Sequence, residues 1–447
     1  MTNFGVIHIG ISDHSLIFLQ RKICVPRSEP RLINKRNFKH YNVDAFRSDL
    51  AVCLVNLTST IQDPNDMWSE WKDRFLAVAD MDAPLETKKV RSVNSPWITK
   101  NMRQKMRHRD FLKKKAIQTK SKHYHQAYKR ERNELNKLIK KTKVEYFTNQ
   151  INSCGKNPKE MWKTINKLTN KTSKITNISE ISQNGNRVTD DATIANTLNE
   201  YFNEIGPKLA SELSQSSKSP ESYLLPCKTR FQIQNVTIHE VFKSLSKLKT
   251  SKSTGYDGIP NKLLKDASDI IAPSLVHIFN ASIMTGIFPN DLKVAIISPI
   301  HKSGSKTQCN NYRPISVLSA VAKILESLIS KQLETYLEEN GVITEHQAGF
   351  RRRHSAQTSL LNVTNQWYIN MDNGCLSGVL FLDLKKAFDC VDHDILLIKM
   401  YTYGIQDQAL KWFRSYLTDR VQICKVKQVT SSKRIIKCGV PQGSNLG

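Results

Sequence analysis

Residues 379–393, VLFLDLKKAFDCVDH, constrain the fold of this chain more than any other stretch. Val379 to Leu382 form an apolar run without alternation, which is typical of a strand covered on both faces. Asp383 follows at the end of that run, where a carboxylate favours a hard divalent cation such as Mg2+. The alternative is that Asp383 caps a helix, because Leu384 to Phe388 suits a helix opening. This segment alone leaves both interpretations open.

The last ten residues, Cys438 to Gly447, have the sequence CGVPQGSNLG. Three glycines and one proline predict a loop with unusual backbone angles. Such a loop lets a nucleotide or a base pair approach the backbone closely. By itself, the pattern also fits any tight turn.

Together, the two segments resemble motifs A and B of reverse transcriptases, specifically those of non-LTR (LINE-type, jockey-like) retrotransposons. Further motifs stand upstream in the order found in these elements: SKSTGYDGIPNKLLK at 251–265, LKVAIISPIHKSGSKTQCNNYRPISVLSAVAKILESLI at 292–329, with an expected turn at NYRPIS, and QAGFRRRHSAQT at 347–358. Retroviral enzymes carry neither NYRPIS nor AFDCVDH, and group II intron maturases have a different pattern around PQG. The resemblance covers residues 251–447.

The resemblance implies roles for five residues. Asp383 is then the ligand of Mg2+ ions, with Mn2+ as an alternative, that stabilise the attacking primer oxygen and the leaving pyrophosphate. Arg313 is the candidate for clamping the triphosphate, because a guanidinium pairs two phosphate oxygens, and Lys302 is a second candidate. Phe388 is the expected gate against a 2′-hydroxyl, or else a core residue. Gln442 is expected near nucleotide and template, or else its amide satisfies loop backbone groups.

Other polar residues near these motifs are less specific. Asp389, Asp392 and His393 fall on a predicted helix, where solvated or capping roles are expected rather than a metal cluster. Asp257 in GYDGIP fits template or nucleotide handling. The run GFRRR contains three candidate phosphate contacts, which are otherwise a solvated patch: Arg351, Arg352 and Arg353.

Both ends depart from the complete family pattern. These polymerases complete the metal site with a later hairpin carrying an adjacent aspartate pair, and no Asp-Asp pair follows Asp383. We therefore expect a truncated polymerase with little or no activity of its own. At the other end, GISDHSLIFLQ at 10–20 predicts a strand after an active-site loop. Asp13 and His14 there resemble the closing motif of the apurinic-type endonuclease of these elements, in which His14 acts as a general acid or base. About twenty residues cannot bury a core, so no nuclease activity is expected.

A basic connector lies between these ends. Residues 100–147 contain 17 Lys or Arg and 4 Asp or Glu, with helical apolar spacing and no Pro or Gly from Ile98 to Cys154. One or two long amphipathic helices are predicted, and their charge excess favours salt-sensitive contact with nucleic-acid phosphates. Further on, NGNRVTDDATIANTLNEYFNEIG at 184–206 predicts a turn and an Asp-capped amphipathic helix.

Composition agrees with a polyanionic partner. The net charge is +27 and the pI is about 9.7. Apolar runs are short, no signal peptide is visible, and the nine cysteines contain no CxxC pair. We expect no membrane partner, and location in the nucleus and cytoplasm as a ribonucleoprotein, not secretion.

We therefore predict an α/β chain with the fingers and partial palm of a right-hand polymerase, preceded by a basic, mainly helical connector. The predicted domains are an endonuclease remnant at 1–22, a connector at 23–235 with a basic helical segment at 96–170, and a reverse transcriptase domain at 236–447. The resemblance implies RNA-directed DNA polymerase activity, with an element RNA template, a target DNA primer and deoxynucleoside triphosphates as partners. The alternative is a non-catalytic nucleic-acid-binding remnant of a retroelement.

Overall fold

The computed structural model describes residues 3–7, 16–20, 31–55, 63–90, 95–155, 157–169, 178–183, 185–214 and 216–447. The chain divides into two compact units. The first takes Met1–Lys35 and Thr87–Ile175, and the second takes Arg36–Glu86 and Thr176–Gly447. Each unit is therefore built from two separate stretches of chain.

Small two-stranded sheets occur in the N-terminal part. β1 (Asn3–Ile7) pairs antiparallel with β2 (Leu16–Gln20). This confirms a strand within residues 10–20. β3 (Arg31–Arg36) and β4 (Leu85–Val90) form a second two-stranded sheet.

The basic segment of the first unit is helical, as predicted. α3 (Lys100–Thr119) and α4 (Lys122–Ser153) pack on each other, and α5 (Pro158–Leu168) contacts α4. The Thr99 side chain accepts a hydrogen bond from the N–H of Met102 and so caps α3. Lys120 has φ +53°, and this left-handed residue separates the two helices. The prediction of one or two long helices is thus confirmed as two.

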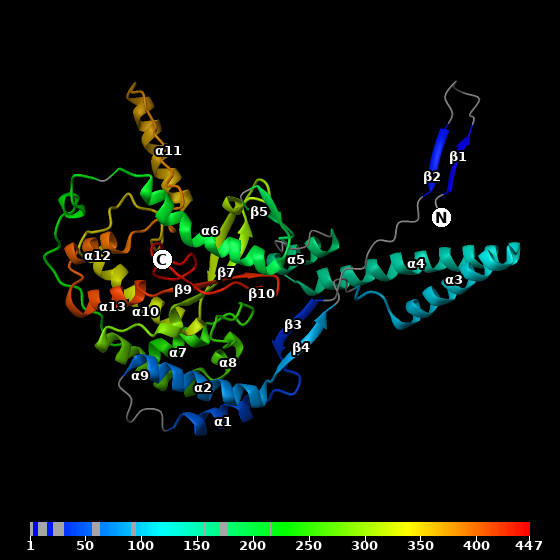
Figure 1. The fold of residues 1–447 in the computed structure, drawn as a ribbon, viewed down its shortest axis with the longest axis horizontal. Coiled ribbons are helices and arrows are strands. Elements are labelled where there is room, and N and C mark those ends of the chain that lie inside the picture. The colour runs from blue at the N-terminus through cyan, green and yellow to red at the C-terminus, as the bar shows by residue number, and fades with distance from the viewer. Residues whose placement is uncertain are drawn as a thin grey trace. The chain divides into compact units, whose positions relative to one another are not determined.

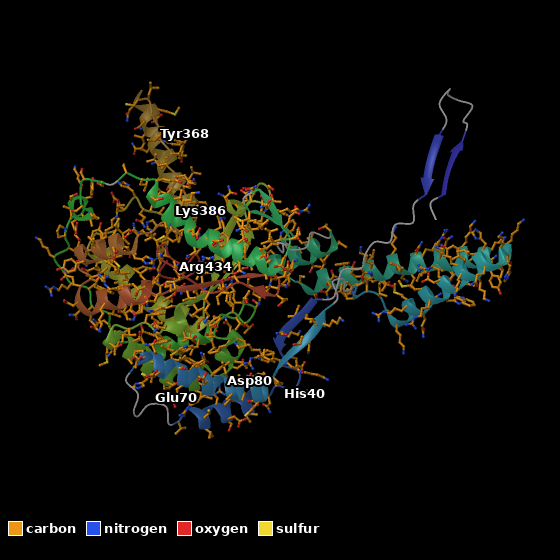
Figure 2. All side chains as sticks on the ribbon, viewed as in Figure 1. His40, Glu70, Asp80, Tyr368, Lys386 and Arg434 are labelled. Carbon is orange, nitrogen blue, oxygen red and sulfur yellow. The ribbon has the colours of Figure 1, made fainter. Side chains whose placement is uncertain are left out.

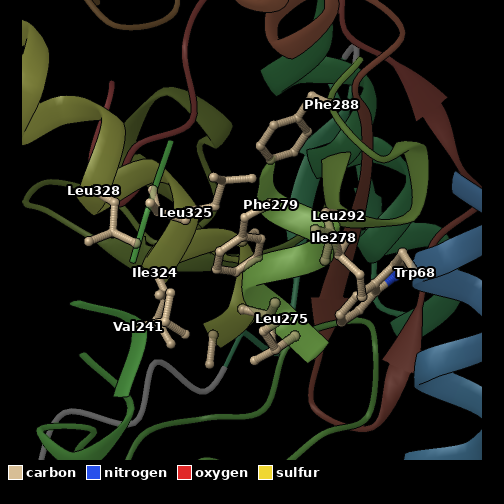
Figure 3. Packing of buried hydrophobic residues seen from close by; sticks show 14 of the residues in the cluster. Trp68, Val241, Leu275, Ile278, Phe279, Phe288, Leu292, Ile324, Leu325 and Leu328 are labelled. Atoms are coloured by element: carbon tan, nitrogen blue, oxygen red, sulfur yellow. The ribbon is translucent and has the colours of Figure 1, made fainter. Parts of the chain in front are cut away.

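The main core of the second unit is helical. Its helices are α1 (Val43–Leu54), α2 (Pro64–Asp82), α7 (Ile238–Ser246), α8 (Asn261–Asp266), α9 (Ser268–Thr285), α10 (Ala320–Glu339), α12 (His393–Thr402) and α13 (Asp407–Leu417). α9 lies at the centre and contacts α1, α2, α7, α8 and α13. Figure 3 shows Phe279 and Leu275 of α9 packed among these helices, and both are fully buried. Truncating such a residue to alanine costs about 2–5 kcal/mol of stability.

A mixed sheet forms the second part of this unit. Its strands are β7 (Val294–His301), β8 (Tyr312–Val317), β9 (Val421–Val426), β10 (Val429–Thr430) and β11 (Arg434–Ile435). β7 is central: it pairs antiparallel with β8 and parallel with β9, and β10 and β11 pair with β9. The NYRPIS segment is therefore mostly a strand rather than the predicted turn. The chain instead turns in the ten residues between β7 and β8, before NYRPIS is complete. This connection contains the 3-10 helix η3 (Cys309–Asn311).

α6 (Asp191–Ser211) contacts β9, β10 and β11 of this sheet. The Asp190 side chain accepts a hydrogen bond from the Thr193 N–H at 2.8 Å, which confirms the predicted aspartate cap. The short hairpin of β5 (Ile181–Gln183) and β6 (Asn186–Val188) precedes the helix. Short 3-10 helices, η1 (Pro220–Tyr223) and η2 (Asn290–Lys293), complete the elements.

α11 (Ala356–Asp372) projects from the rest of its unit (Figure 1) and contains no buried residue. Tyr368 on this helix is 67% exposed (Figure 2). The segment that follows, residues 375–384, contains no strand, and Phe381 is 86% exposed. The prediction of a covered strand at Val379 to Leu382 is therefore wrong. No described strand pairs with this segment, and the side chains of Leu380, Phe381 and Leu382 are each more than 80% exposed.

The boundaries of the two compact units differ from the predicted domain limits. α1, α2 and α6 belong to the predicted connector, yet they pack with the helices and strands of residues 236–447. Among the described residues, no helix has the length and apolar composition needed to cross a membrane.

Candidate active site

The closing loop, residues 438–447, contains no helix or strand, as predicted. Gly439 has φ +85° and Gly443 has φ +121°, angles that favour glycine. A Cβ on Gly439 would lie 2.9 Å from the Phe388 carbonyl oxygen, and a Cβ on Gly443 would lie 3.0 Å from the Ser316 carbonyl oxygen. The Ser316 N–H donates to the Gln442 carbonyl oxygen at 2.9 Å. These glycines let the loop touch both β8 and the segment around Phe388.

The 385–392 turn lies directly against this loop. The Gly439 N–H donates to the Val391 carbonyl oxygen at 2.7 Å, and the Val440 N–H donates to the Phe388 carbonyl oxygen at 2.8 Å. His393 Nε2 lies 2.8 Å from the Gly439 carbonyl oxygen. The two motifs that lie about fifty residues apart in sequence are thus joined by backbone hydrogen bonds.

Asp389 is the side chain through which the turn and the loop meet. Gln442 Nε2 donates to Asp389 Oδ1 at 3.0 Å. Burial raises the pKa of Asp389, against the opposing effects of Gln442 and of the nearby Lys386. The helix expected here begins only after Asp392, whose side chain accepts a hydrogen bond from the Ile395 N–H and caps α12. Capping is therefore confirmed for Asp392, whereas the contact of Asp389 with the loop was not foreseen.

α10 holds the other end of the loop. The Asn445 N–H donates to Glu326 Oε2 at 2.8 Å, and Asn445 Nδ2 donates to the Lys323 carbonyl oxygen at 2.7 Å. Glu326 is fully buried and also accepts a hydrogen bond from the Tyr416 hydroxyl at 3.2 Å. Burial raises the pKa of Glu326. A buried carboxylate needs such partners, and the loop supplies one of them.

Gly206 is a further residue that sequence reasoning missed. It lies inside α6, and a Cβ there would collide with the Asp389 carbonyl oxygen and with Cys438 Sγ, at 2.6 Å from the latter. Only glycine lets the helix approach both the turn and the closing loop. The signal in the sequence is a glycine followed by Pro207 inside an amphipathic helix.

Three cationic side chains gather beside the turn. Lys302 lies in the connection after β7 and Arg313 lies on β8, and both are exposed. Burial is the main cause that lowers the pKa of Lys386, and the charges of Lys302 and Arg313 lower it further. The sequence-predicted Lys302 and Arg313 are thus near each other and near the 385–392 turn.

An open cavity of about 750 Å³ lies beside the start of the turn, and Lys386 is among its lining residues, whereas Lys302 and Arg313 are not. It lies between α6, β5, η3 and the start of the 385–392 turn, and Tyr201, Cys309 and Lys386 contribute to its wall. The Nζ atom of Lys386, which is labelled in Figure 2, lies 5.6 Å from the ring centroid of Tyr201. The lining therefore combines an aromatic ring with charges of both signs, because Glu200 and Glu204 also line the cavity.

Asp383 is exposed and follows the uncovered apolar run. It caps no described helix: α12 begins at His393 and is capped by Asp392. The described residues contain no group of three His, Cys, Asp or Glu that could hold a metal ion, and the role of Asp383 as a metal ligand stays a prediction. A single carboxylate does not make a preformed metal centre. It fits only a metal ion that also binds substrate phosphates.

The family model described as "Reverse transcriptase (RNA-dependent DNA polymerase)" matches residues 300–447. Residues 300–447 are a reverse transcriptase domain. All the contacts between the closing loop, the 385–392 turn, β8 and α10 lie within this domain, and Gly206 comes from outside it.

Curated relatives extend the similarity beyond the reverse transcriptase domain. The relative named "Probable RNA-directed DNA polymerase from transposon BS" of Drosophila melanogaster is 25% identical over 455 residues, which cover 98% of this chain and 48% of the relative. The polymerase from mobile element jockey of the same species is 27% identical, covering 86% of this chain and 42% of the relative. That of transposon X-element, also from Drosophila melanogaster, is 33% identical, covering 46% and 23%. The chain spans less than half the length of each. The resemblance to jockey-like non-LTR elements is thereby confirmed.

Phe388 is half-buried in the reverse transcriptase domain. Its ring packs edge-on against Phe350, with centroids 6.0 Å apart. Phe350 itself is 82% exposed, so the pair lies at the surface rather than in the core. The interpretation of Phe388 as a gate stays a prediction.

The arginine run of the reverse transcriptase domain is partly neutralised. Arg351 Nε lies 3.5 Å from Glu338 Oε1, and Arg352 Nε lies 3.6 Å from Glu334 Oε2, both on α10. Arg353 is exposed, with φ +60°. Asp257, by contrast, is buried and accepts a hydrogen bond from the Ser319 hydroxyl at 2.5 Å, which ties its loop to the start of α10.

In the first unit, the α3–α4 hairpin carries unbalanced positive charge. All four of its acidic side chains pair within the hairpin, with Lys105, Arg109 and Lys141. No other basic side chain of residues 100–147 has a carboxylate partner within the described part of the chain. Asp13 and His14, the predicted endonuclease remnant, lie outside the described residues.

Proposed function

We propose that this chain is part of the RNA-directed DNA polymerase of a jockey-like non-LTR retrotransposon. In the intact protein this enzyme copies element RNA into DNA from a primer on nicked target DNA, using deoxynucleoside triphosphates. The observation that carries the proposal is the closing loop hydrogen-bonded to the 385–392 turn beside the β7–β8 hairpin, inside a segment that matches reverse transcriptases. In this proposal, β7 and β8 belong to the fingers, and residues 379–447 belong to the palm.

The proposed substrate contacts follow from charge and position. Asp383 binds Mg2+, or Mn2+, together with the phosphates of the substrate, and the ion supplies charge neutralisation at the reacting phosphate. Arg313 and Lys302 bind the triphosphate of the incoming nucleotide. The β7–β8 hairpin supports this pairing: the Lys302 N–H donates to the Asn311 carbonyl oxygen at 2.8 Å, and Arg313 pairs with Ile300, so the two exposed cations come from the same end of the hairpin.

Primer extension on a homopolymer RNA template with Mg2+ tests the polymerase. In a longer version of the protein that includes the Asp-Asp hairpin, which is used for all activity tests below, we expect extension that Asp383→Asn abolishes. Asp372→Asn, at an exposed carboxylate on α11, should leave it unchanged. Equal extension by both variants contradicts the role of Asp383. If the unmodified longer protein binds RNA but extends no primer, the alternative function is supported: a non-catalytic nucleic-acid-binding remnant.

Phe388 is proposed to exclude ribonucleotides. Replacing it by Ala or Val should admit ribonucleoside triphosphates, because the removed ring leaves space for a 2′-hydroxyl. Phe381→Ala, which alters an exposed ring of the uncovered run, is the matched control. Unchanged discrimination in folded Phe388→Ala assigns the ring to packing against Phe350 instead.

The α3–α4 hairpin is proposed to contact RNA or target DNA phosphates, and Arg351, Arg352 and Arg353 are proposed as further contacts. Lys113→Glu with Lys114→Glu should weaken RNA binding and reduce the slope of log affinity against log salt by roughly 1–2. Lys247→Glu, an exposed change in the second unit, is the control. An affinity that does not fall with salt rejects the electrostatic interface.

Two further proposals rest on the resemblance alone. Asp13 and His14 are the remnant of an apurinic-type endonuclease, and the protein works in the nucleus and cytoplasm as a ribonucleoprotein. Imaging of a tagged chain together with its RNA tests the location. A secreted product would contradict it.

A further inference from the structure

Two carboxylates hold the closing loop at the ends of its four-residue segment Gln442 to Asn445. We propose that Asp389 and Glu326 are positioning residues of the polymerase site, which orient Gln442 so that its side-chain carbonyl oxygen faces the bound nucleotide or template. This inference rests on the proposed polymerase function. Neither carboxylate is assigned a role by the resemblance of the motifs.

The first step of the argument is the chemistry of Asp389. A carboxyl oxygen that carries no proton only accepts hydrogen bonds, so the Gln442 group that faces Asp389 Oδ1 must be the NH2 group. Gln442 Nε2 indeed donates to Asp389 Oδ1 at 3.0 Å. The Gln442 carbonyl oxygen then points elsewhere, and no described residue donates to it. The side chain therefore offers an acceptor, not a donor, to a ligand.

The second step is the fixed position of Asp389 itself. Its N–H donates to the Lys386 carbonyl oxygen at 2.8 Å, and its carbonyl oxygen accepts a hydrogen bond from Cys438 Sγ at 3.4 Å. Gly206 of α6 closes over the same carbonyl group. The backbone of Asp389 is thus held on two sides, which fixes the position of its carboxylate. The carboxylate can therefore determine the orientation of the Gln442 side chain.

The third step is the opposite end of the segment. Glu326 accepts the Asn445 N–H, and the same α10 face holds Asn445 Nδ2 through the Lys323 carbonyl oxygen. Ser330, one turn further along this face, donates its hydroxyl to the Asn445 carbonyl oxygen at 3.4 Å. The Gln442 backbone carbonyl is held in turn by the Ser316 N–H. With both ends bound, rotation of the Gln442 side chain is the remaining freedom, and Asp389 removes it.

Hydrogen exchange of single backbone amides in the full chain tests the Asp389 contact. Gln442→Glu places two carboxylates face to face, so the Gly439 and Val440 amides should exchange roughly tenfold faster or more. Adding Asp389→Asn should restore slow exchange, because the asparagine NH2 group donates to the new glutamate. If the double variant exchanges as fast as Gln442→Glu, the contact does not position the loop and the proposal fails.

The Glu326 contact is tested in the same way. Glu326→Gln should speed exchange of the Asn445 amide by roughly tenfold, because a charged acceptor is lost. Tyr416→Phe is the comparison variant: it removes the other hydrogen bond of Glu326 and the contact of the Tyr416 hydroxyl with Ser444, but leaves the acceptor of the Asn445 N–H in place. Equal exchange of the Asn445 amide in all three proteins removes Glu326 from the proposal.

Primer extension distinguishes positioning from mere packing. Asp389→Asn keeps the size of the side chain but lets the Gln442 amide rotate, so KM for deoxynucleotides should rise roughly three- to tenfold with little change in kcat. An unchanged KM, with exchange also unchanged, overturns the orienting role. These kinetics are measured on the longer protein that includes the Asp-Asp hairpin. If that protein extends no primer, the proposed function fails, and the exchange measurements still decide whether the two carboxylates hold the loop.

Discussion

β7 and the 378–384 segment are both apolar runs, yet they end in opposite environments. β7, VAIISPIH, pairs with β8 on one side and with β9 on the other, and Ile297 is 2% exposed. The segment GVLFLDL pairs with no described strand, and Leu380 is 82% exposed. The same kind of sequence is a central strand in one place and an uncovered stretch in the other.

An apolar run therefore favours burial, but it does not by itself determine whether the segment is buried. A strand buries its side chains only where neighbours satisfy its backbone groups and another layer covers its face. β7 obtains both, from β8 and β9 at its edges and from α6, whose side chains share a core cluster with Ala295 and Ile297. Residues 378–384 pair with no described strand and are exposed.

The largest expected effect comes from a charge placed in β7. Ile297→Asp should lower the free energy of unfolding by about 4 kcal/mol or more, or prevent folding, because the charge is buried without a partner. Urea unfolding followed by tryptophan fluorescence measures this. A loss of stability below about 1 kcal/mol would mean that β7 is not buried in the sheet.

The covered region should also determine a pH dependence. Burial raises the pKa of Asp257 from 3.8 to about 6. Because the folded state favours the protonated form, this contribution is full below about pH 4 and is lost as the pH rises through about 6. Asp257→Asn should therefore gain stability relative to the unmodified chain by up to about 3 kcal/mol between pH 4 and pH 7. Denaturant curves at both pH values measure the difference, and a constant difference contradicts the buried carboxyl.

Limited proteolysis tests whether residues 378–384 are uncovered in solution. Chymotrypsin should cut first at Leu380, Phe381 or Leu382, because an exposed, unpaired backbone needs no unfolding before cleavage. The buried Tyr312 site on β8, the strand paired with β7, should resist until the unit unfolds. Mass spectrometry of early fragments locates the cuts. Early cleavage at Tyr312 would reverse the assignment of the two regions.

The smallest effect should come from a charge in the uncovered run. Leu380→Asp should change the free energy of unfolding by about 0.5 kcal/mol or less, because the side chain is already in solvent. The same urea assay as for Ile297→Asp provides the matched measurement. A loss of several kcal/mol would show that this run is covered in solution.

Local features of the fold were predictable because neighbouring residues create them. The aspartate caps at Asp190 and Asp392, the two basic helices and the glycine-rich closing loop all arise from short-range hydrogen bonds and backbone angles. The proximity of Lys302 and Arg313 to the turn also agrees with the resemblance of their motifs.

Long-range contacts were not predictable in this way. Asp389 meets Gln442 across 53 residues, and Glu326 meets Asn445 across 119 residues. Periodicity and capping patterns carry no information on such pairs, which depend on how α6, α10 and β8 come together. For the same reason, Asp389 was predicted to lie on a helix. The sequence around Gly206 likewise gave little indication that this glycine contacts the turn and the closing loop.

The amino-acid sequence by itself determined the family of the reverse transcriptase domain, the basic helices and the local caps, because these depend on residue order and short-range physics. Only the tertiary structure decided that β7 is covered while residues 378–384 are not, and that two buried or half-buried carboxylates hold the closing loop. Burial is a property of what packs against a segment, and that is set by residues far away in the chain.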